Sequence, residues 1–256
     1  MKVEAIKTRI VHAGEISLTD LLSESITEVS ENSVVVISSK IVSLCENRIV
    51  DIDSISKDDL VECESDWYVN RSFSPLNYMF AISKGNMSAS AGIDLSNSDG
   101  HYTLWPKDSM ISAEHARQFL TEKFARKNIG VLIIDSVTLP PLRRGTVGQM
   151  IGWSGFKPLK DYRGQPDLFG RKFEMETLSI VNGLAAAANL VMGEGDEGCP
   201  LAIVSDVPFI EFTPCPPTND EIKIGFVSRE EDIYAPFFNL APWKKGGGGY
   251  EKPGEK

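Results

Sequence analysis

Three acidic residues stand among small neighbours, where a carboxylate can reach a metal ion. Asp94 lies in the run Ala-Gly-Ile-Asp-Leu-Ser-Asn, Asp135 follows the apolar run Val-Leu-Ile-Ile, and Glu194 lies in a glycine-rich turn. Mg²⁺ in proteins commonly takes one or two carboxylates together with waters and substrate phosphates. Taken alone, each acid is more readily explained as a turn former or a helix cap. Together the three acids favour the hypothesis of an oxygen-ligated metal centre.

The choice of metal follows from the scarcity of nitrogen and sulfur ligands. The chain has three histidines and four cysteines, and no two cysteines have CxxC spacing. A structural zinc site and a disulfide framework therefore lack support. Any metal would be held mainly by oxygen, which favours Mg²⁺ or Mn²⁺.

The glycine-rich turn also bears on phosphate binding. Gly193, Gly195 and Gly198 match the GxGxxG fingerprint, but here a predicted helix precedes the turn and a strand follows it. Dinucleotide binding needs the opposite order, so the Rossmann interpretation is rejected. The sequence also lacks a Walker A motif. The turn can still present backbone N–H groups to phosphate, or can simply end the helix with Gly193 in the left-handed region.

Basic residues gather between positions 143 and 172. Arginine suits bidentate recognition of carboxylate and phosphate, although many of these charges are expected on the solvated surface. Glycines in the segments 160–164 and 167–171 predict structured loops, where binding residues concentrate. A serine-hydrolase interpretation fails because GxSxG is absent. The basic set is Arg143, Arg144, Lys157, Lys160, Arg163, Arg171 and Lys172.

The elements that must position these residues follow from apolar periodicity. We predict helices over 18–29 with Ser17 as N-cap, over 113–127 with Ser112 as N-cap, and over 176–192 with an alanine-rich face for close packing. Buried strands are predicted over 34–37, 130–134 and 200–204. Strands and helices mixed without a regular βαβ rhythm indicate an α+β or mixed α/β fold. Residues 241–256, with four consecutive glycines, are predicted to form a flexible tail after a catalytic domain over 1–240.

Charge and hydropathy limit the partners. A formal net charge of −10 argues against nonspecific nucleic-acid binding, and it means that anionic substrates would need a local cation. The charged N-terminus does not resemble a secretory signal, and no apolar stretch approaches the ~20 residues that cross a bilayer. A cytoplasmic protein without a membrane or nucleic-acid partner is expected.

Several segments together resemble the coenzyme F-420 (deazaflavin) gamma-glutamyl ligases, and within them the branch labelled as folate-metabolism gamma-glutamate ligases. The resemblance extends in order over roughly residues 2–210. It implies a two-lobed α+β homodimer with mixed β-sheets, neither Rossmann nor P-loop, with nucleotide and metals in a cleft. The matching pieces are SSKIVSLCENRIV at 38–50, ESDWYV at 64–69, SAGIDLSNSDG at 90–100, IIDSVTLPPLRRGTVGQMIGWSGFKPLKDYRGQPDLFGR at 133–171 and AAAANLVMGEG at 185–195.

The same resemblance implies roles for individual residues. Asp94 and Asp135 would bind one Mg²⁺ or Mn²⁺ ion, and Ser136 with Glu194 would bind a second; K⁺ is a further candidate ion. Basic residues expected at the reacting groups are Arg144, Lys160 and Arg163. The residues expected to contact the nucleotide are Ser39, Lys40, Asn97, Met192, Gly193, Gly195, Asp196, Gly198 and Cys199.

The implied reaction uses GTP, with ATP as an alternative. The γ-phosphoryl group moves to the carboxylate of a small-molecule acceptor, and the amine of L-glutamate then attacks the acyl phosphate to form an amide. The chemistry fits the residues because two anions can be brought together only if metals and basic groups neutralise their charge.

Two departures from the family pattern leave the acceptor open. Leu44 stands where these ligases commonly have lysine, and the segment 137–142 lacks the usual Gly-Arg after the metal-binding strand. They motivate one alternative, a catalytically silent nucleotide- or metal-binding or regulatory protein of the same fold. A further alternative is a phosphoryl-transfer enzyme that forms no amide.

Overall fold

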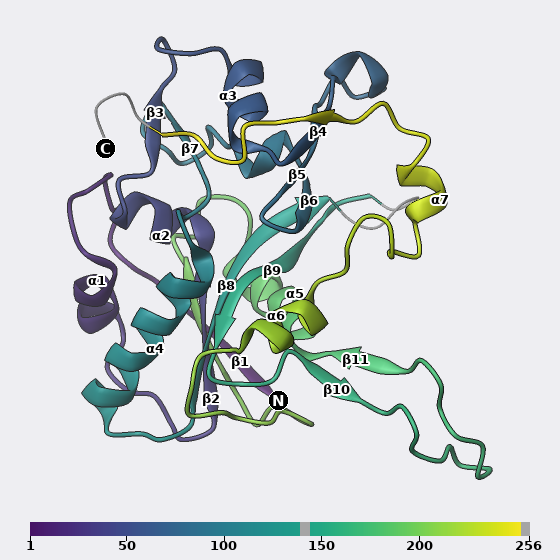
Figure 1. The fold of residues 1–256 in the computed structure, drawn as a ribbon. Coiled ribbons are helices and arrows are strands. Elements are labelled where there is room, and N and C mark those ends of the chain that lie inside the picture. The colour runs from purple at the N-terminus through teal and green to yellow at the C-terminus, as the bar shows by residue number, and fades with distance from the viewer. Residues whose placement is uncertain (139–143, 252–256) are drawn as a thin grey trace.

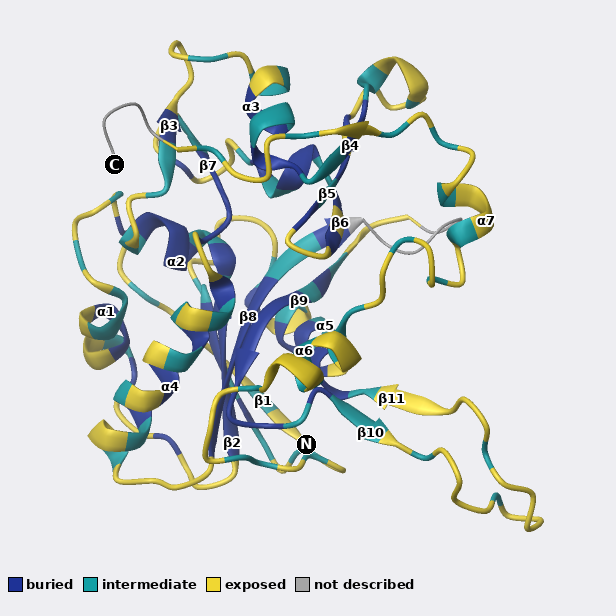
Figure 2. Cartoon of the chain, in the orientation of Figure 1, coloured by how far each residue is buried: buried dark blue, intermediate teal, exposed yellow. Residues whose placement is uncertain are grey.

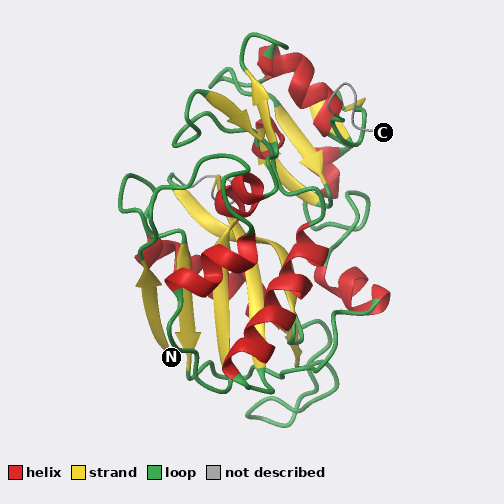
Figure 3. Ribbon diagram, turned by 90° about the vertical axis from the view of Figure 1, so that its left-hand side faces the viewer, coloured by secondary structure: helices red, strands yellow, loops and turns green. Residues whose placement is uncertain are grey.

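A computed structural model describes residues 1–138 and 144–251, which form two lobes (Figures 1 and 3). The larger lobe is built on a five-stranded sheet. Its strands β2 and β8 are parallel, whereas the other neighbouring pairs are antiparallel. This mixed sheet, with helices packed on it, confirms the predicted α+β class. The strand order is β1 (Lys2–Ile6), β12 (Leu201–Ser205), β2 (Ser33–Ser38), β8 (Ile129–Thr138) and β9 (Thr146–Ser154).

Helices cover both faces of this sheet because its central strands are apolar on both sides. In β2, Val35 and Ile37 join the cluster under α1 (Leu18–Ser25), α2 (Ser39–Cys45) and α4 (Ser109–Phe124), whereas Val34 and Val36 face α5 (Ile180–Met192). Successive strand residues point to opposite faces, so a doubly covered strand is a continuous apolar run. Figure 2 shows these strands as the buried centre.

The alanine-rich face of α5 packs closely on β9, as predicted. A Cβ atom on Gly148 would lie 2.3 Å from the carbonyl oxygen of Ala185, so the backbones of β9 and α5 are in direct contact at this point. The helix begins at Ile180 rather than at 176, because residues 177–179 form β11 (Thr177–Ser179). Ser179 caps the helix by accepting a hydrogen bond from the Asn182 N–H.

The other two predicted helices also need corrections. Ser17 caps α1 as predicted, but the helix ends at Ser25. Helix α4 begins four residues earlier than expected because Asp108, not Ser112, accepts hydrogen bonds from the first-turn N–H groups. The Ser112 hydroxyl instead donates to Glu46 at 2.6 Å.

The smaller lobe has its own sheet and core. Its four-stranded sheet has the order β13 (Lys244–Lys245), β4 (Trp67–Val69), β5 (Phe80–Ser83) and β6 (Asn86–Ala89). Helix α3 (Lys57–Glu64) packs on it through Leu60 and Val61. The remaining elements of the lobe are the pair β3 (Ile49–Asp51) and β7 (His101–Thr103), and the 3₁₀ helices η1 (Arg71–Phe73) and η2 (Ser90–Gly92).

Strands β10 (Leu159–Asp161) and β11 form an arm that projects from the larger lobe (Figure 1). Its connecting residues 162–176 are largely exposed (Figure 2). The apolar side chains of Leu168 and Phe169 near the tip are almost fully exposed.

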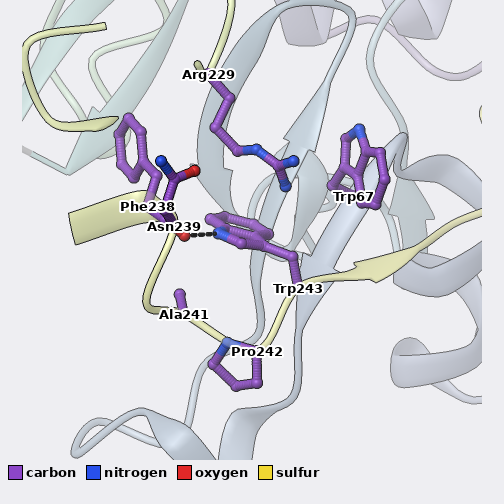
Figure 4. A pocket seen from close by; sticks show the side chains of 7 residues that line it. All are labelled: Trp67, Arg229, Phe238, Asn239, Ala241, Pro242 and Trp243. Carbon is purple, nitrogen blue, oxygen red and sulfur yellow. Dashed lines mark hydrogen bonds between the residues drawn. The ribbon is translucent and has the colours of Figure 1, made fainter. Parts of the chain in front are cut away.

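The C-terminal segment crosses from one lobe to the other as a strap, residues 207–251. Its helix α6 (Asn219–Gly225) contributes Ile222 to the larger lobe's core, and α7 (Ala235–Phe238) follows. The Arg229 guanidinium then lies between two indole rings, 4.6 Å from the centroid of Trp67 and 5.9 Å from that of Trp243 (Figure 4). The contact with Trp67 in β4 joins the strap to the smaller lobe, and the contact with Trp243 lies within the strap.

Residues 244–250 of the predicted tail pack against the smaller lobe. Strand β13 pairs with β4, and the N–H groups of Gly246 and Gly247 donate to carbonyl oxygens of Asp66 and Glu62. A Cβ on Gly246 would lie 2.2 Å from the Ser65 carbonyl oxygen, so these glycines permit close packing. Residues 252–256 lie outside the described residues, and the domain boundary at 240 stays a prediction. Within 1–138 and 144–251, no helix is long and apolar enough to cross a membrane.

Candidate functional site

A cavity of about 1000 Å³ opens where the two lobes meet. It lies at the carboxyl ends of the parallel strands β2 and β8, the usual place for ligands on such sheets. Strand β12 runs antiparallel to β2, so the glycine-rich turn that precedes β12 lies at this same edge. The smaller lobe closes the cavity with residues of α3, η2 and the loop 94–99.

Asp94 is placed by a strained piece of backbone. Ser90, Ala91 and Gly92 all have positive φ, which costs about 1–2 kcal/mol for each non-glycine residue. Strain of this kind concentrates at functional sites. Burial alone would raise the pKa of Asp94, but hydrogen bonds from Lys40 (Nζ to Oδ2, 2.6 Å) and from Ser96 lower that pKa to about 2. Asp94 is therefore ionised.

Asp135 is held by neutral donors. It lies inside β8, paired with Gln149, rather than after the strand as predicted; a register shift between Ile133 and Ile134 precedes it. Its carboxylate accepts hydrogen bonds from Ser39 Oγ at 2.9 Å and Trp105 Nε1 at 2.6 Å. Burial raises its pKa to about 6, although these two bonds and the Lys40 charge oppose the shift. A nearby cation would therefore stabilise the ionised form of this carboxyl group.

Gly92 and Trp105 form a unit that supports Asp135. A Cβ atom on Gly92 would lie 2.1 Å from Cε2 of Trp105, so only glycine lets the indole take this position. Trp105 is buried, with 2% of its surface exposed, and its N–H points at the carboxylate. The glycine before Asp94 thereby also positions the second acid, Asp135.

Ser136 and Glu194 come together as predicted, 58 residues apart in sequence. Ser136 Oγ donates to Glu194 Oε1 at 2.6 Å, and Asn189 Nδ2 donates to the same oxygen at 2.7 Å. Asn189 lies in the last turn of α5, and Ser136 in β8. Helix and strand thus fix this carboxylate from two sides.

The glycine-rich turn faces the cavity and links the lobes. Gly193 has φ +82° and ends α5, while Asn97 Nδ2 from the smaller lobe donates to the Gly195 carbonyl at 3.0 Å. The Gly195 N–H is engaged by the carboxylate of Glu197 at 2.8 Å. A backbone donor of the turn therefore already holds an anionic group, consistent with an anion nest.

Most of the predicted site residues line this one cavity. The predicted metal ligands Asp94, Asp135, Ser136 and Glu194 all do so. Ser39 is an exception: it is buried, and its hydroxyl holds Asp135. The predicted nucleotide contacts on the cavity wall are Lys40, Asn97, Met192, Gly193, Gly195, Asp196, Gly198 and Cys199.

The three predicted catalytic basic residues are not brought to the cavity within one chain. Lys160 and Arg163 lie on the arm, where Lys160 is near the Tyr162 ring and Arg163 pairs with Asp161 at 2.6 Å. Arg144 is exposed and is not part of the cavity wall. Their catalytic role stays a prediction. Most of the divergent segment 137–142 lies outside the described residues.

Several cavity residues escaped the sequence analysis. Lys7, Arg9 and His12 come from the segment after β1, and Lys57 begins α3. These residues lie among ordinary sequence neighbours, so the sequence offered no signal for them. Leu44 lines the cavity with Ile41 and Ile49 and makes this part of the wall apolar.

The arrangement of acids suits a metal held partly by substrate. Among residues 1–138 and 144–251, no group of three or more His, Cys, Asp or Glu side chains is arranged to hold an ion. The available donors are carboxylate and hydroxyl oxygens in pairs, as in Ser136 with Glu194. Mg²⁺ is commonly bound in this way, with substrate phosphates and waters completing the shell.

Comparison with known proteins identifies relatives of this chain. A sequence model described as F420-0:gamma-glutamyl ligase matches residues 5–206. A protein of Methanocaldococcus jannaschii named coenzyme F420:L-glutamate ligase is 34% identical over 81% of this chain and 90% of its own length. A protein of the same name from Methanococcus maripaludis is 33% identical over 91% of this chain and 97% of its own. The chain belongs to the F420-0:gamma-glutamyl ligase family.

Proposed function

We propose that this protein is a ligase that joins L-glutamate to the carboxylate of a small-molecule acceptor and uses GTP and Mg²⁺ or Mn²⁺. Family membership supports glutamate ligation, and the names of the relatives make the deazaflavin F420-0 the first acceptor to test. The observation that carries the proposal is the cavity itself. It unites Asp94, Asp135 and the Ser136–Glu194 pair with a glycine-rich turn at one sheet edge.

The residues present fit a divalent metal. The carboxylate of Asp135 has no ion-pair partner within 4.0 Å among the described residues, and burial raises its pKa to about 6. A cation at this carboxylate would offset the cost of burying it. A bound Mg²⁺ or Mn²⁺ would neutralise phosphate charge during transfer. Asp94 with Asp135 would hold one ion, and Ser136 with Glu194 a second.

The chain's own residues would then orient the reactants. The N–H groups of Gly193 and Gly195 are already bonded within the chain, so phosphate oxygens would take the other backbone N–H groups of the turn 193–198. Asn97 holds this turn in place through the Gly195 carbonyl. The Lys40 ammonium, 2.6 Å from Asp94, can neutralise a phosphate oxygen near that carboxylate. Transfer places the γ-phosphoryl group on an oxygen of the acceptor carboxylate and releases GDP. The glutamate amine attacks the acyl carbon, phosphate leaves, and the amide remains.

The proposal is tested by incubating the protein with GTP or ATP, Mn²⁺, L-glutamate and either F420-0 or a folate. Mass spectrometry should detect the glutamyl adduct only in the complete mixture. Asp135→Asn and Glu194→Gln should each lower kcat/KM at least about a hundredfold. Asp220→Asn, at an exposed carboxylate on α6, is the matched control. Absence of product with every acceptor, or full activity of Asp135→Asn, would overturn the proposal.

The same experiment separates the two alternatives. A catalytically silent protein would bind GTP with Mn²⁺ in calorimetry but form neither GDP nor amide. A phosphoryl-transfer enzyme would release GDP without dependence on glutamate. We further propose a homodimer, and light scattering at the mass of one 28.2 kDa chain would contradict that assembly.

A further inference from the structure

We propose that Lys57 binds an anionic group of the acceptor, and that the wall around Lys57 is the acceptor-binding part of the cavity. This inference rests on the proposed function and deepens it. Lys57 is the first residue of α3, is half-buried and lines the cavity. The residues proposed for the nucleotide come instead from α2, the loop 94–99 and the turn after α5.

The charge of Lys57 has no counterpart in the described part of the chain. No carboxylate oxygen there forms an ion pair with its ammonium group within 4.0 Å, and the two acids whose charge reaches Lys57, Asp94 and Asp58, are each paired with another cation. The neighbouring Asp58 is paired with Arg71 (Nε to Oδ2, 2.8 Å), and Asp94 is paired with Lys40 at 2.6 Å. Lys57 is therefore a cation on the cavity wall that is available to a ligand.

Burial makes such a cation costly without an anion. Desolvation lowers the pKa of Lys57 from its ordinary value, although the nearby charge of Asp94 opposes the shift. A carboxylate or phosphate from a ligand would offset the free-energy cost of desolvating the ammonium group and would form a charge-assisted hydrogen bond with it. A lysine serves well here because its ammonium is a compact point charge on a flexible stem.

The surroundings of Lys57 indicate the rest of the ligand. Helix α3 packs on η2, and the Ser90 N–H donates to the Met79 carbonyl at 2.7 Å, so α3, η2 and the loop before β5 form one continuous wall. Tyr78 and Ile93 present aromatic and apolar surface on this wall. A cation beside such surface suits a ligand with a flat or apolar body and an anionic end, which describes a deazaflavin or folate better than free glutamate.

The test compares Lys57→Gln, which removes the charge, with Lys57→Arg, which keeps it. Lys223→Gln on α6 is the matched surface control, since that lysine is largely exposed. Calorimetry measures the binding of F420-0 with no nucleotide present, and initial rates give separate KM values for acceptor, L-glutamate and GTP. Circular dichroism and Tm establish that each variant is folded.

We expect Lys57→Gln to weaken F420-0 binding and to raise the acceptor KM by about tenfold or more. Lys57→Arg should recover part of the loss, and the KM values for GTP and glutamate should stay within about twofold. A rise confined to the GTP or the glutamate KM would assign Lys57 to that substrate and overturn the proposal. Unchanged F420-0 binding in Lys57→Gln, or wild-type protein that binds no F420-0, would also overturn it.

The two proposals fail in different ways. If the wild-type protein and Lys57→Gln form the amide equally well, the proposed ligase activity stands and the proposed role of Lys57 is refuted. If the wild-type protein binds F420-0 through Lys57 but forms no amide with any nucleotide, the proposed ligase activity is refuted and the proposed role of Lys57 in binding stands.

Discussion

Replacing Trp105 with phenylalanine tests how the protein prepares Asp135 for a cation. The Trp105 N–H donates to Asp135 Oδ2 at 2.6 Å, and phenylalanine keeps an aromatic ring but removes this donor. Losing a hydrogen bond to a charged group costs about 1.5–3 kcal/mol. At about 1.36 kcal/mol per pKa unit, the pKa of Asp135 should rise from about 6 by roughly one to two units.

The assay is calorimetric titration with Mn²⁺ between pH 5 and 8. Protonated Asp135 cannot bind a cation, so wild-type affinity should be constant above its pKa of about 6 and fall about tenfold per pH unit below it. In Trp105→Phe the midpoint of this fall should move upward, toward pH 7–8. Affinity at pH 7 should then drop by up to about tenfold and recover at higher pH.

Trp153→Phe provides the matched control. Trp153 is fully buried, and its Nε1 has no hydrogen-bond partner among the described residues, so its replacement should lower stability without moving the pH profile. Identical profiles for wild type and Trp105→Phe would refute the role of Trp105 in holding Asp135.

Two further substitutions test the framework around the site. Gly92→Ala should cost more than about 3 kcal/mol or displace Trp105, since its Cβ would lie 2.1 Å from the ring and φ is +73°. Gly100→Ala, with φ +79° and open space around the new atom, should cost only about 1–2 kcal/mol in chemical denaturation; equal losses would contradict the clash. Arg229→Ala should lower the free energy of unfolding by about 1–3 kcal/mol and expose the strap 207–251 to limited proteolysis. Unchanged proteolysis would show that the two indole contacts do not hold the strap.

The sequence predicted the central strands because the residue types within each strand are themselves typical of buried strands. The apolar runs at 34–37 and 130–134 are rich in β-branched residues and buried on both faces, and such runs predict strands without further information. Helix ends were less predictable. Asp108 and Ser112 are both good N-caps; in the fold Asp108 caps the helix, whereas the Ser112 hydroxyl lies within the first turns and donates to Glu46 and to the Asp108 carbonyl.

The assembly of the site could not be derived from local sequence. Ser136 and Glu194 meet only because β8 and the end of α5 reach the same sheet edge, and their pairing was predicted through family resemblance. Trp105 and Lys57 gave no signal because their roles depend on what lies across the cavity. The four-glycine run is a related case: its composition favours flexibility, whereas the fold places Gly246 where the strap approaches the Ser65 carbonyl too closely for a Cβ atom.

In the proposed reaction the acceptor carboxylate is activated as an acyl phosphate before glutamate attacks. An acceptor labelled with ¹⁸O in its carboxylate tests this directly, because the oxygen that bonds to the γ-phosphorus leaves with the phosphate. Mass spectrometry of the products should find one labelled oxygen in the inorganic phosphate for each amide formed. Unlabelled phosphate formed together with the amide would contradict the account.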